Sequence, residues 1–211
     1  MEQLAALRKS YERAELDENA SASDPLDQFR LWLDQAIEAK LPEPNAMTLA
    51  TVGADGQPST RIVLIKGLDA RGIVWYTNYE SRKGRELEEN PRAAIVVYWN
   101  ALGRQVRVEG TVRRLPVEES DEYWATRPAR SRAAAAASRQ SEPLASLEGL
   151  EAEAERLLAE HGGEVPRPER WGGYVLEPDA IELWQHRDDR LHDRIRFTRE
   201  GGSWRAERLA P

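Results

Sequence analysis

The chain has 211 residues, a length that suits one domain or one domain with a helical appendage. Lysine and arginine total 30 against 37 acidic residues, and the formal charge of −7 argues against general nucleic-acid binding. The chain has no cysteine, which excludes disulfides, thiolate nucleophiles and cysteine-based metal sites. Its 3 histidines show no metal-ligand spacing, so no metal is expected.

Residues 1–45 are predicted to form an N-terminal helical segment. Asp24 and Pro25 predict a helix start, because aspartate caps helix N-termini and proline suits the first helical position. The apolar residues that follow on one face, as far as Leu41-Pro42, are Leu26, Phe29, Leu33 and Ile37. No apolar run reaches the length of a membrane span and Met1-Glu2-Gln3 does not open a signal peptide, so we expect a cytoplasmic protein without a membrane partner.

From residue 46 the apolar residues follow the two-residue period of strands. Strands are predicted at 46–52, 59–68 and 73–77, joined as an antiparallel meander. Ser81 predicts the cap of a short helix that ends at Glu89. Two further strands are predicted at 93–99 and 105–115, the second alternating cleanly between its two faces.

The C-terminal half is predicted to mix helices and strands. Helices are expected at 116–127, 133–137 and 147–160, and strands at 173–176, 180–184, 195–199 and 203–209, with Gly201-Gly202 as a hairpin turn. Seven or eight mostly antiparallel strands in all favour a closed or partly closed barrel with helical decoration. Residues 46–211 are therefore expected to form one barrel domain.

The segment Trp184–Arg194 is the most unusual stretch of the sequence. It interleaves Arg187, Arg190 and Arg194 with aspartates and with His186 and His192. Arginines held by carboxylates, beside histidines that exchange protons near neutral pH, suit an anion-binding and proton-handling site. The alternative is a solvated, salt-bridged loop.

Two further basic stretches lie in the first half of the chain. Arg61 and Lys66 close the two ends of an apolar run, and strand parity puts them on opposite faces. Ser81, Arg82 and Lys83 stand at a helix start, where a hydroxyl and cations suit phosphate. The alternatives are strand-end cations and a capped surface helix. No glycine-rich dinucleotide, phosphate-loop or nucleophile-elbow motif is present.

Several short motifs occur together and in order: Arg61–Lys66, Trp75–Asn78, Ser81–Lys83, Glu89–Arg92, Arg104–Val106, Arg127-Pro128, Ser138–Ser141, Trp171–Gly173, Arg190–Arg194 and Arg208–Pro211. With them the chain, from about Leu7 to Pro211, resembles the pyridoxine/pyridoxamine 5′-phosphate oxidase family. The resemblance implies an FMN-binding split β-barrel of the α+β class, assembled as a homodimer with its sites at the interface.

The resemblance also implies roles for individual residues. The FMN site would consist of Arg61, Ile62, Val63, Leu64, Ile65, Lys66, Tyr76, Thr77, Arg82, Lys83, Gln105, Gln140, Ser141, Trp184 and Arg194. The substrate would meet Arg8, Tyr11, Lys66, Tyr123, Arg127, Ser131, Arg190 and His192, with Arg8 and Tyr11 in a segment that closes over it. Arg190 and His192 are the catalytic candidates, His192 either as proton acceptor or orienter or as a structural histidine.

The implied reaction converts pyridoxamine or pyridoxine 5′-phosphate to pyridoxal 5′-phosphate. Hydride passes from substrate C4′ to flavin N5, and O2 reoxidises the flavin to give H2O2. The alternatives are a split-barrel flavin oxidase with another substrate, as in phenazine pathways, and a flavin- or pyridoxal-phosphate-binding protein with impaired turnover. Two departures bear on them: Ala133–Ala137 replaces a Gly-Ala-Trp element, and His186-Arg187 stands where the family usually has glycine.

Overall fold

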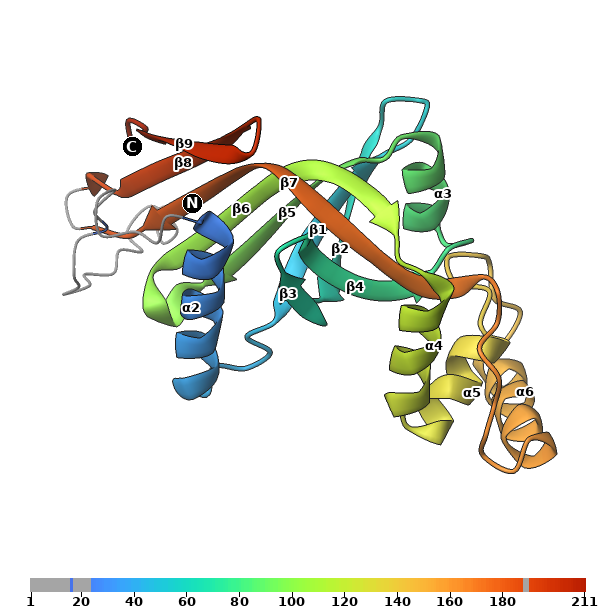
Figure 1. Cartoon of the computed structure of the whole chain (residues 1–211). Helices are drawn as coiled ribbons and strands as arrows, with labels where there is room; N and C mark the ends of the chain where they lie inside the picture. The colour runs from blue at the N-terminus through green and yellow to red at the C-terminus, as the bar shows by residue number, and fades with distance from the viewer. Residues whose placement is uncertain (1–15, 17–23, 188–189) are drawn as a thin grey trace, which may run out of the picture. The chain divides into compact units, whose positions relative to one another are not determined.

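The computed structural model describes residue 16, residues 24–187 and residues 190–211. In this part of the chain one sheet has the strand order β2-β1-β5-β6-β7-β4-β3, with β8 paired to β7 and β9 to β8 (Figure 1). The strands are β1 (Ala46–Val52), β2 (Pro58–Leu64), β3 (Gly67–Asp69), β4 (Gly72–Asn78), β5 (Arg92–Trp99), β6 (Arg104–Arg114), β7 (Trp171–Gln185), β8 (Asp193–Glu200) and β9 (Ser203–Arg208). The fold is an antiparallel split β-barrel with helices, as predicted.

The chain divides into two compact units. Unit 1 comprises Met1–Thr48, Ala94–Gly110 and Pro178–Pro211, and unit 2 comprises Leu49–Ala93 and Thr111–Glu177. The described helices are α2 (Pro25–Glu38), α3 (Arg82–Glu89), α4 (Val117–Thr126), α5 (Ala129–Ala137), α6 (Leu147–Glu160) and a 3-10 turn η1 (Asn100–Leu102). None of them is both long enough and apolar enough to cross a membrane. The division into a segment 1–45 and a domain 46–211 stays a prediction.

In unit 1, helix α2 starts where the sequence predicts. The Asp24 side chain accepts the Leu26 N–H at 2.9 Å, and Pro25 occupies the first turn. The helix ends at Glu38 rather than near Leu41, and the prediction that Ile37 belongs to the apolar face is wrong, since Ile37 is 52% exposed. The buried stripe includes Trp32 and Ala36, which turn the packed face away from residue 37.

The predicted strands 173–176 and 180–184 are one continuous strand, β7. It pairs antiparallel with β4 as far as Leu176 and with β8 from Ala180 onwards. Pro178 falls between these two paired stretches, so its missing N–H costs neither of them a hydrogen bond. The hairpin of β8 and β9 turns at Gly201, whose φ of 62° suits glycine, as predicted.

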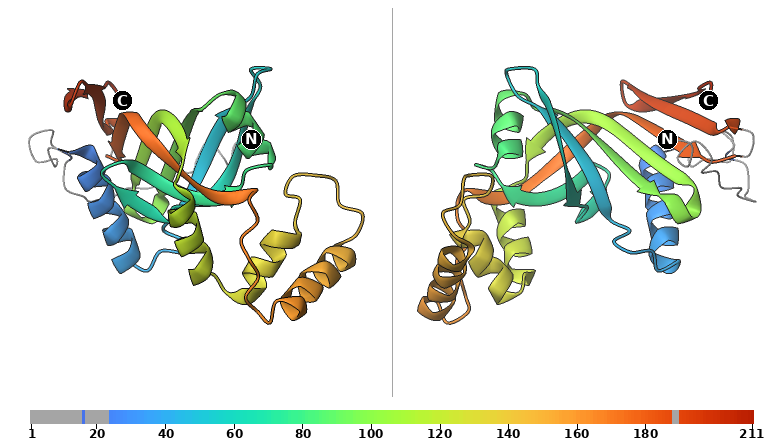
Figure 2. Two further views of the ribbon diagram at one scale, coloured as in Figure 1. Left: turned by 45° about the vertical axis from the view of Figure 1, so that its right-hand side comes forward. Right: turned by 180° about the vertical axis from the view of Figure 1, so that it is seen from behind.

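In unit 2 the predicted strand 59–68 is broken. Strand β2 ends at Leu64, and β3 starts at Gly67 and pairs antiparallel with β4. The two halves therefore pair with different neighbours, β2 with β1 and β3 with β4, so the predicted meander of three continuous strands is interrupted between Leu64 and Gly67. Helices α5 and α6 lie side by side (Figure 2).

Candidate functional site

A pocket of about 530 Å³ lies within unit 2. Its lining combines cations, hydroxyls, an amide, apolar side chains and aromatic rings from β2, β4, α3, α4 and the loop after α5. The lining residues are Ser59, Thr60, Arg61, Ile62, Val63, Leu64, Lys66, Tyr76, Thr77, Arg82, Lys83, Tyr123, Gln140 and Ser141. Such a mixture suits a ligand with an anionic end and a planar apolar part.

The pocket brings together two cations that strand parity had separated. Arg61 lies in β2, whereas Lys66 lies in the break between β2 and β3, and both line the pocket. The prediction of opposite faces is wrong because the chain leaves the strand after Leu64, so the two-residue period no longer applies. Both basic ends of the 61–66 motif therefore face one cavity.

The start of α3 contributes a helix cap and a buried lysine to the site. The Ser81 hydroxyl accepts the Gly84 N–H at 3.3 Å and donates to the Asn78 carbonyl at 2.7 Å, which confirms the predicted cap. Lys83 is buried, and its Nζ donates to Thr77 Oγ1 at 3.0 Å and to Gln140 Oε1 at 2.8 Å. Burial and the nearby Arg61 charge lower the pKa of Lys83 to about 8.

The sequence analysis missed Glu86, as well as Ser59 and Thr60 of the pocket lining. Glu86 is 8% exposed. Its carboxylate accepts hydrogen bonds from Thr51 Oγ1 at 2.5 Å, Ser59 Oγ at 2.6 Å and Arg82 Nε at 2.8 Å. Arg61 Nη2 lies 3.2 Å from the same carboxylate. Burial raises the pKa of Glu86, but the hydrogen bonds from Ser59, Thr51 and Arg82 outweigh burial and hold it at about 2.

Glu86 thereby fixes Arg61, which also donates to Leu49 O at 3.1 Å and Thr51 Oγ1 at 2.6 Å. Burial lowers the pKa of the Arg61 guanidinium, with Glu86 opposing the change. The only sequence signal for Glu86 was its position four residues after Arg82, where helical geometry favours an ion pair.

Aromatic rings form one wall beside the cations. Tyr76 and Tyr123 are stacked with ring centroids 3.9 Å apart, and Trp171 lies parallel 5.8 Å from Tyr76. The Arg127 guanidinium lies over Trp171 at 4.8 Å and donates to Ser131 O at 3.1 Å. Tyr123 lines the pocket, whereas Arg127 and Ser131 are not among its lining residues.

The loop after α5 closes another side of the pocket. Gln140 Oε1 accepts from Lys83 and from Thr77 Oγ1, the latter at 3.1 Å, and Ser141 has a φ of 75°. The alanine run 133–137 is helical, as predicted, and ends α5 just before this loop. Ile65, the remaining member of the 61–66 motif, is buried and is not among the lining residues.

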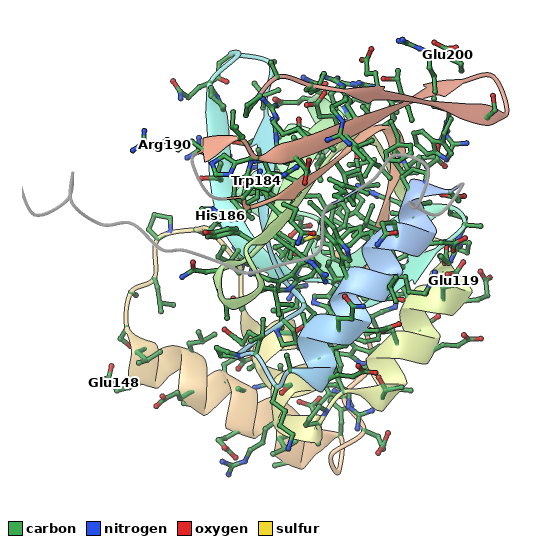
Figure 3. All side chains as sticks on the ribbon, turned by 90° about the vertical axis from the view of Figure 1, so that its left-hand side faces the viewer. Glu119, Glu148, Trp184, His186, Arg190 and Glu200 are labelled. Carbon is green, nitrogen blue, oxygen red and sulfur yellow. The ribbon has the colours of Figure 1, made fainter. Side chains whose placement is uncertain are left out.

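The remaining predicted residues within the described part of the chain lie in unit 1. The rings of Trp184, His186 and His192 form a cluster whose centroids are 4.7 to 5.9 Å apart. Arg190 is exposed in the turn before β8, where Figure 3 shows it projecting outward. The segment thus contains a histidine cluster together with ion pairs.

Arg194 Nε donates to Glu182 Oε1 at 2.9 Å, and its Nη1 donates to Ala210 O at 2.9 Å. Gln105 lies in β6. Arg8 and Tyr11 fall outside the described residues, so their proposed closing over the substrate has no structural description.

Known structures define the class. A structure of PhzG from Burkholderia lata, in complex with tetrahydrophenazine-1-carboxylic acid, is 37% identical with a TM-score of 0.91 and covers 96% of this chain and 100% of that one. A pyridoxamine 5′-phosphate oxidase-related, FMN-binding protein from Nostoc punctiforme shares the fold at 16% identity, with a TM-score of 0.71 over 87% of this chain and 97% of its own. These likenesses place the chain among the split-barrel proteins.

The family model "Pyridoxamine 5′-phosphate oxidase" matches residues 33–160, and the "Pyridoxine 5′-phosphate oxidase C-terminal dimerisation region" matches residues 171–211. The chain belongs to the pyridoxamine 5′-phosphate oxidase family. A protein of Methylibium petroleiphilum named pyridoxine/pyridoxamine 5′-phosphate oxidase is 60% identical over 209 residues, 99% of this chain and 98% of its own. One of the same name from Thermosynechococcus vestitus is 54% identical over 100% of both. The match to a dimerisation region supports a homodimer.

Proposed function

We propose that this protein oxidises pyridoxamine 5′-phosphate and pyridoxine 5′-phosphate to pyridoxal 5′-phosphate with bound FMN. The observation that carries the proposal is the pocket in unit 2, where Arg61, Arg82 and Lys83 meet beside a wall of tyrosines. Membership of the family supports the same reading. O2 is the proposed electron acceptor, and H2O2 is its product.

The charges of the pocket suit a phosphate monoester. Arg61, Arg82 and Lys83 contribute three positive charges when protonated, and Glu86 balances one. A phosphate dianion would compensate the remainder, and the lowered pKa of Lys83 indicates that this charge lacks full compensation from the protein alone. We therefore assign the FMN phosphate to Arg61, Arg82, Lys83 and Ser141.

The remaining residues of the flavin site are assigned from the family resemblance, starting from the proposed phosphate site. Bound FMN would supply the acceptor for the hydride that leaves substrate C4′. The side chains proposed to hold its ring and ribityl chain are Ile62, Val63, Leu64, Ile65, Lys66, Tyr76, Thr77, Gln105, Gln140, Trp184 and Arg194. In our proposal the two copies of the homodimer share these sites at their interface.

A second set of side chains is proposed to hold the substrate phosphate. Lys66 and Tyr123 line the pocket, and Arg127 is held over Trp171 with a half-buried guanidinium. Ser131 follows in the first turn of α5. These residues would fix the phosphate, and Arg8 and Tyr11 would close over it, so that the substrate's reactive carbon is held in one orientation.

Arg190 and His192 are proposed to meet the pyridine ring. Arg190, as a permanent cation, would orient the ring and stabilise negative charge that develops on it. His192 would orient the ring by hydrogen bonding and so help to set the protonation of the substrate amine. Water would then hydrolyse the imine of the amine substrate to the aldehyde and ammonia.

Anaerobic mixing with pyridoxamine 5′-phosphate tests the proposal. The purified, FMN-loaded protein is expected to be yellow, its flavin absorbance is expected to bleach on mixing, and admission of air should restore the colour with release of H2O2. A protein that stays colourless after incubation with FMN contradicts the flavin site. A yellow protein that does not bleach contradicts the substrate.

The likeness to PhzG favours a second candidate, an oxidase that acts on a tricyclic carboxylic acid. The same anaerobic experiment with a dihydrophenazine carboxylate distinguishes the two. Bleaching by the phenazine and not by pyridoxamine 5′-phosphate would replace the first proposal with the second. FMN and pyridoxal 5′-phosphate binding without bleaching by either substrate would instead indicate a binding protein with impaired turnover.

A further inference from the structure

The histidine cluster of unit 1 has a geometry that the proposed function does not use. The ring centroids of His186 and His192 lie 4.8 Å apart with planes inclined at 41°, and the Trp184 ring lies 4.7 Å from that of His192. Figure 3 labels Trp184 and His186. His192 is therefore flanked by two rings, one of which titrates. His186 is part of the environment that decides the protonation of His192.

A backbone hydrogen bond fixes the tautomer of His192. The Arg187 N–H donates to His192 Nδ1 at 3.2 Å. A neutral imidazole whose Nδ1 accepts a hydrogen bond carries its proton on Nε2. Protonation of Nδ1 would set two N–H groups against each other and break this bond. In this arrangement His192 presents an N–H donor at Nε2 rather than a proton acceptor.

The chain around the two histidines is held from both sides. The His186 N–H donates to the Gly103 carbonyl at 2.8 Å. Arg187 Nη1 lies 3.3 Å from Asp193 Oδ1, and Asp193 is buried. Arg208 also pairs with Asp193, at 2.7 Å. The donor to His192 Nδ1 is thus anchored through its own side chain.

Among the described residues, the groups that shift the pKa of His192 all lower it. Burial lowers the pKa of His192, and the charges of His186 and Arg190 lower it further. The other cations beside it, Arg187 and Arg208, are paired with Asp193. A positive charge on the His192 ring would be repelled by His186 and Arg190, and no carboxylate among the described contacts pairs with this ring.

We propose that His186 is a positioning residue whose ring packs against His192 and keeps it neutral, so that the Nε2–H set by the Arg187 bond faces the pyridine ring of the substrate. The last part of this inference rests on the proposed function, and the remainder concerns the protein alone. His192 then orients the substrate and does not act as a base. His186 acts through His192 and has no contact with the substrate itself.

Imidazole ¹⁵N NMR tests the inference on the unaltered protein, which has only 3 histidines to assign. At neutral pH we expect His192 to show the Nε2–H tautomer, with a titration midpoint below the ordinary value of a histidine. His192 in the Nδ1–H tautomer, or protonated at pH 7, would overturn the proposal. The measurement needs neither flavin nor substrate, and no variant has to fold for it.

Two substitutions distinguish the effect of the His186 charge on His192 from the effect of the His186 ring. His186→Phe keeps a ring against His192 and removes the titrating group, so the His192 midpoint should rise by about half a pH unit. His186→Gly also opens the ring to water and should raise the midpoint further. His161→Phe, in unit 2, is the matched control and should leave it unchanged. Equal midpoints in all these proteins would contradict a role for His186.

The pH profile of kcat/KM with pyridoxamine 5′-phosphate gives a second readout. Because protonation of His192 breaks its bond from Arg187, activity should fall on the acid side at the His192 midpoint. That limb should move to higher pH in His186→Phe, by the same amount as the NMR midpoint. A limb that stays in place would contradict the proposed action through His192. Absence of oxidase activity in every protein, with the NMR pattern intact, would instead contradict the proposed function.

Discussion

The cation cluster of unit 2 and the histidine cluster of unit 1 hold their charged groups in different ways. In unit 2, Lys83 and Glu86 are buried on a capped helix and form hydrogen bonds with side chains from three strands, β1, β2 and β4. In unit 1, His192 lies at the start of a hairpin and depends on the backbone of Arg187. Both sites are thus ordered by the protein itself, the first by side chains on a helix and the second by a backbone donor in a loop. In our proposal the first takes the FMN phosphate and the second meets the substrate.

Lys83→Met tests the cation cluster of unit 2 with the largest expected effect. The substitution removes a buried charge and keeps most of the side-chain volume, so FMN affinity should fall about 100-fold. Riboflavin, which lacks the phosphate, should bind almost as before. Fluorescence titration with both flavins measures the difference. Arg85→Met, an exposed arginine of the same helix outside the pocket lining, is the control. Equal losses for both flavins would contradict the phosphate assignment.

Glu86→Gln tests whether the buried carboxylate holds the cluster together. Loss of its charge leaves Arg61 and Arg82 without their shared counter-charge, and one accepting oxygen becomes an N–H donor, so we expect a loss of about 2–3 kcal/mol in the free energy of unfolding. The pKa of Glu86 in the folded protein is about 2, below the ordinary 4.5. Glu86 therefore stabilises the fold fully above pH 4.5, and this stabilisation is lost as the pH falls toward 2. Urea unfolding of the flavin-free protein between pH 7 and 3 should therefore show the variant losing less stability on acidification than the parent. Parallel curves would refute this role.

Arg127→Ala tests the boundary between the flavin and substrate sites. The KM for pyridoxamine 5′-phosphate should rise about thirtyfold, the cost of one charged hydrogen bond to phosphate. FMN affinity should change little, because Arg127 is not among the residues assigned to the flavin. Steady-state kinetics and flavin titration on the same preparation measure both. Equal losses of the two would count against the assignment.

The pH dependence of FMN binding gives the smallest of these effects. Lys83 is charged below its pKa of about 8 and neutral above it, so FMN affinity should fall about tenfold between pH 7 and pH 9. The sign follows because bound phosphate favours the charged lysine and raises its pKa. Lys83→Met should abolish this part of the slope. A flat profile for the parent protein would show that Lys83 stays charged throughout the range.

The features predicted most accurately from the sequence depend on neighbouring residues. Asp24 and Ser81 each cap a helix within three residues of themselves, and both starts are confirmed. The errors come from distant partners. Lys66 lines the same pocket as Arg61 because the chain leaves the strand after Leu64, and Pro178 falls between the stretches of β7 that pair with β4 and with β8.

Glu86 went unpredicted for the same reason. Its hydroxyl donors stand 35 and 27 residues away along the chain, and no local period reveals them. The cations of the pocket were identified in the sequence because they belong to motifs that the family resemblance singled out. The Glu86 carboxylate, which orders these cations, belongs to none of the motifs, and its role is recognised only from the three-dimensional structure.

The close approach of α3 to the end of β4 makes a residue without a side chain the most fragile part of the pocket. A Cβ atom at Gly84 would lie 1.9 Å from the Tyr79 carbonyl oxygen, which is backbone and unable to move aside alone. Gly84 is also the donor to the Ser81 cap, one position beyond Lys83. A redesign of this pocket for other anions can therefore vary its lysine and arginines, but residue 84 has to remain glycine.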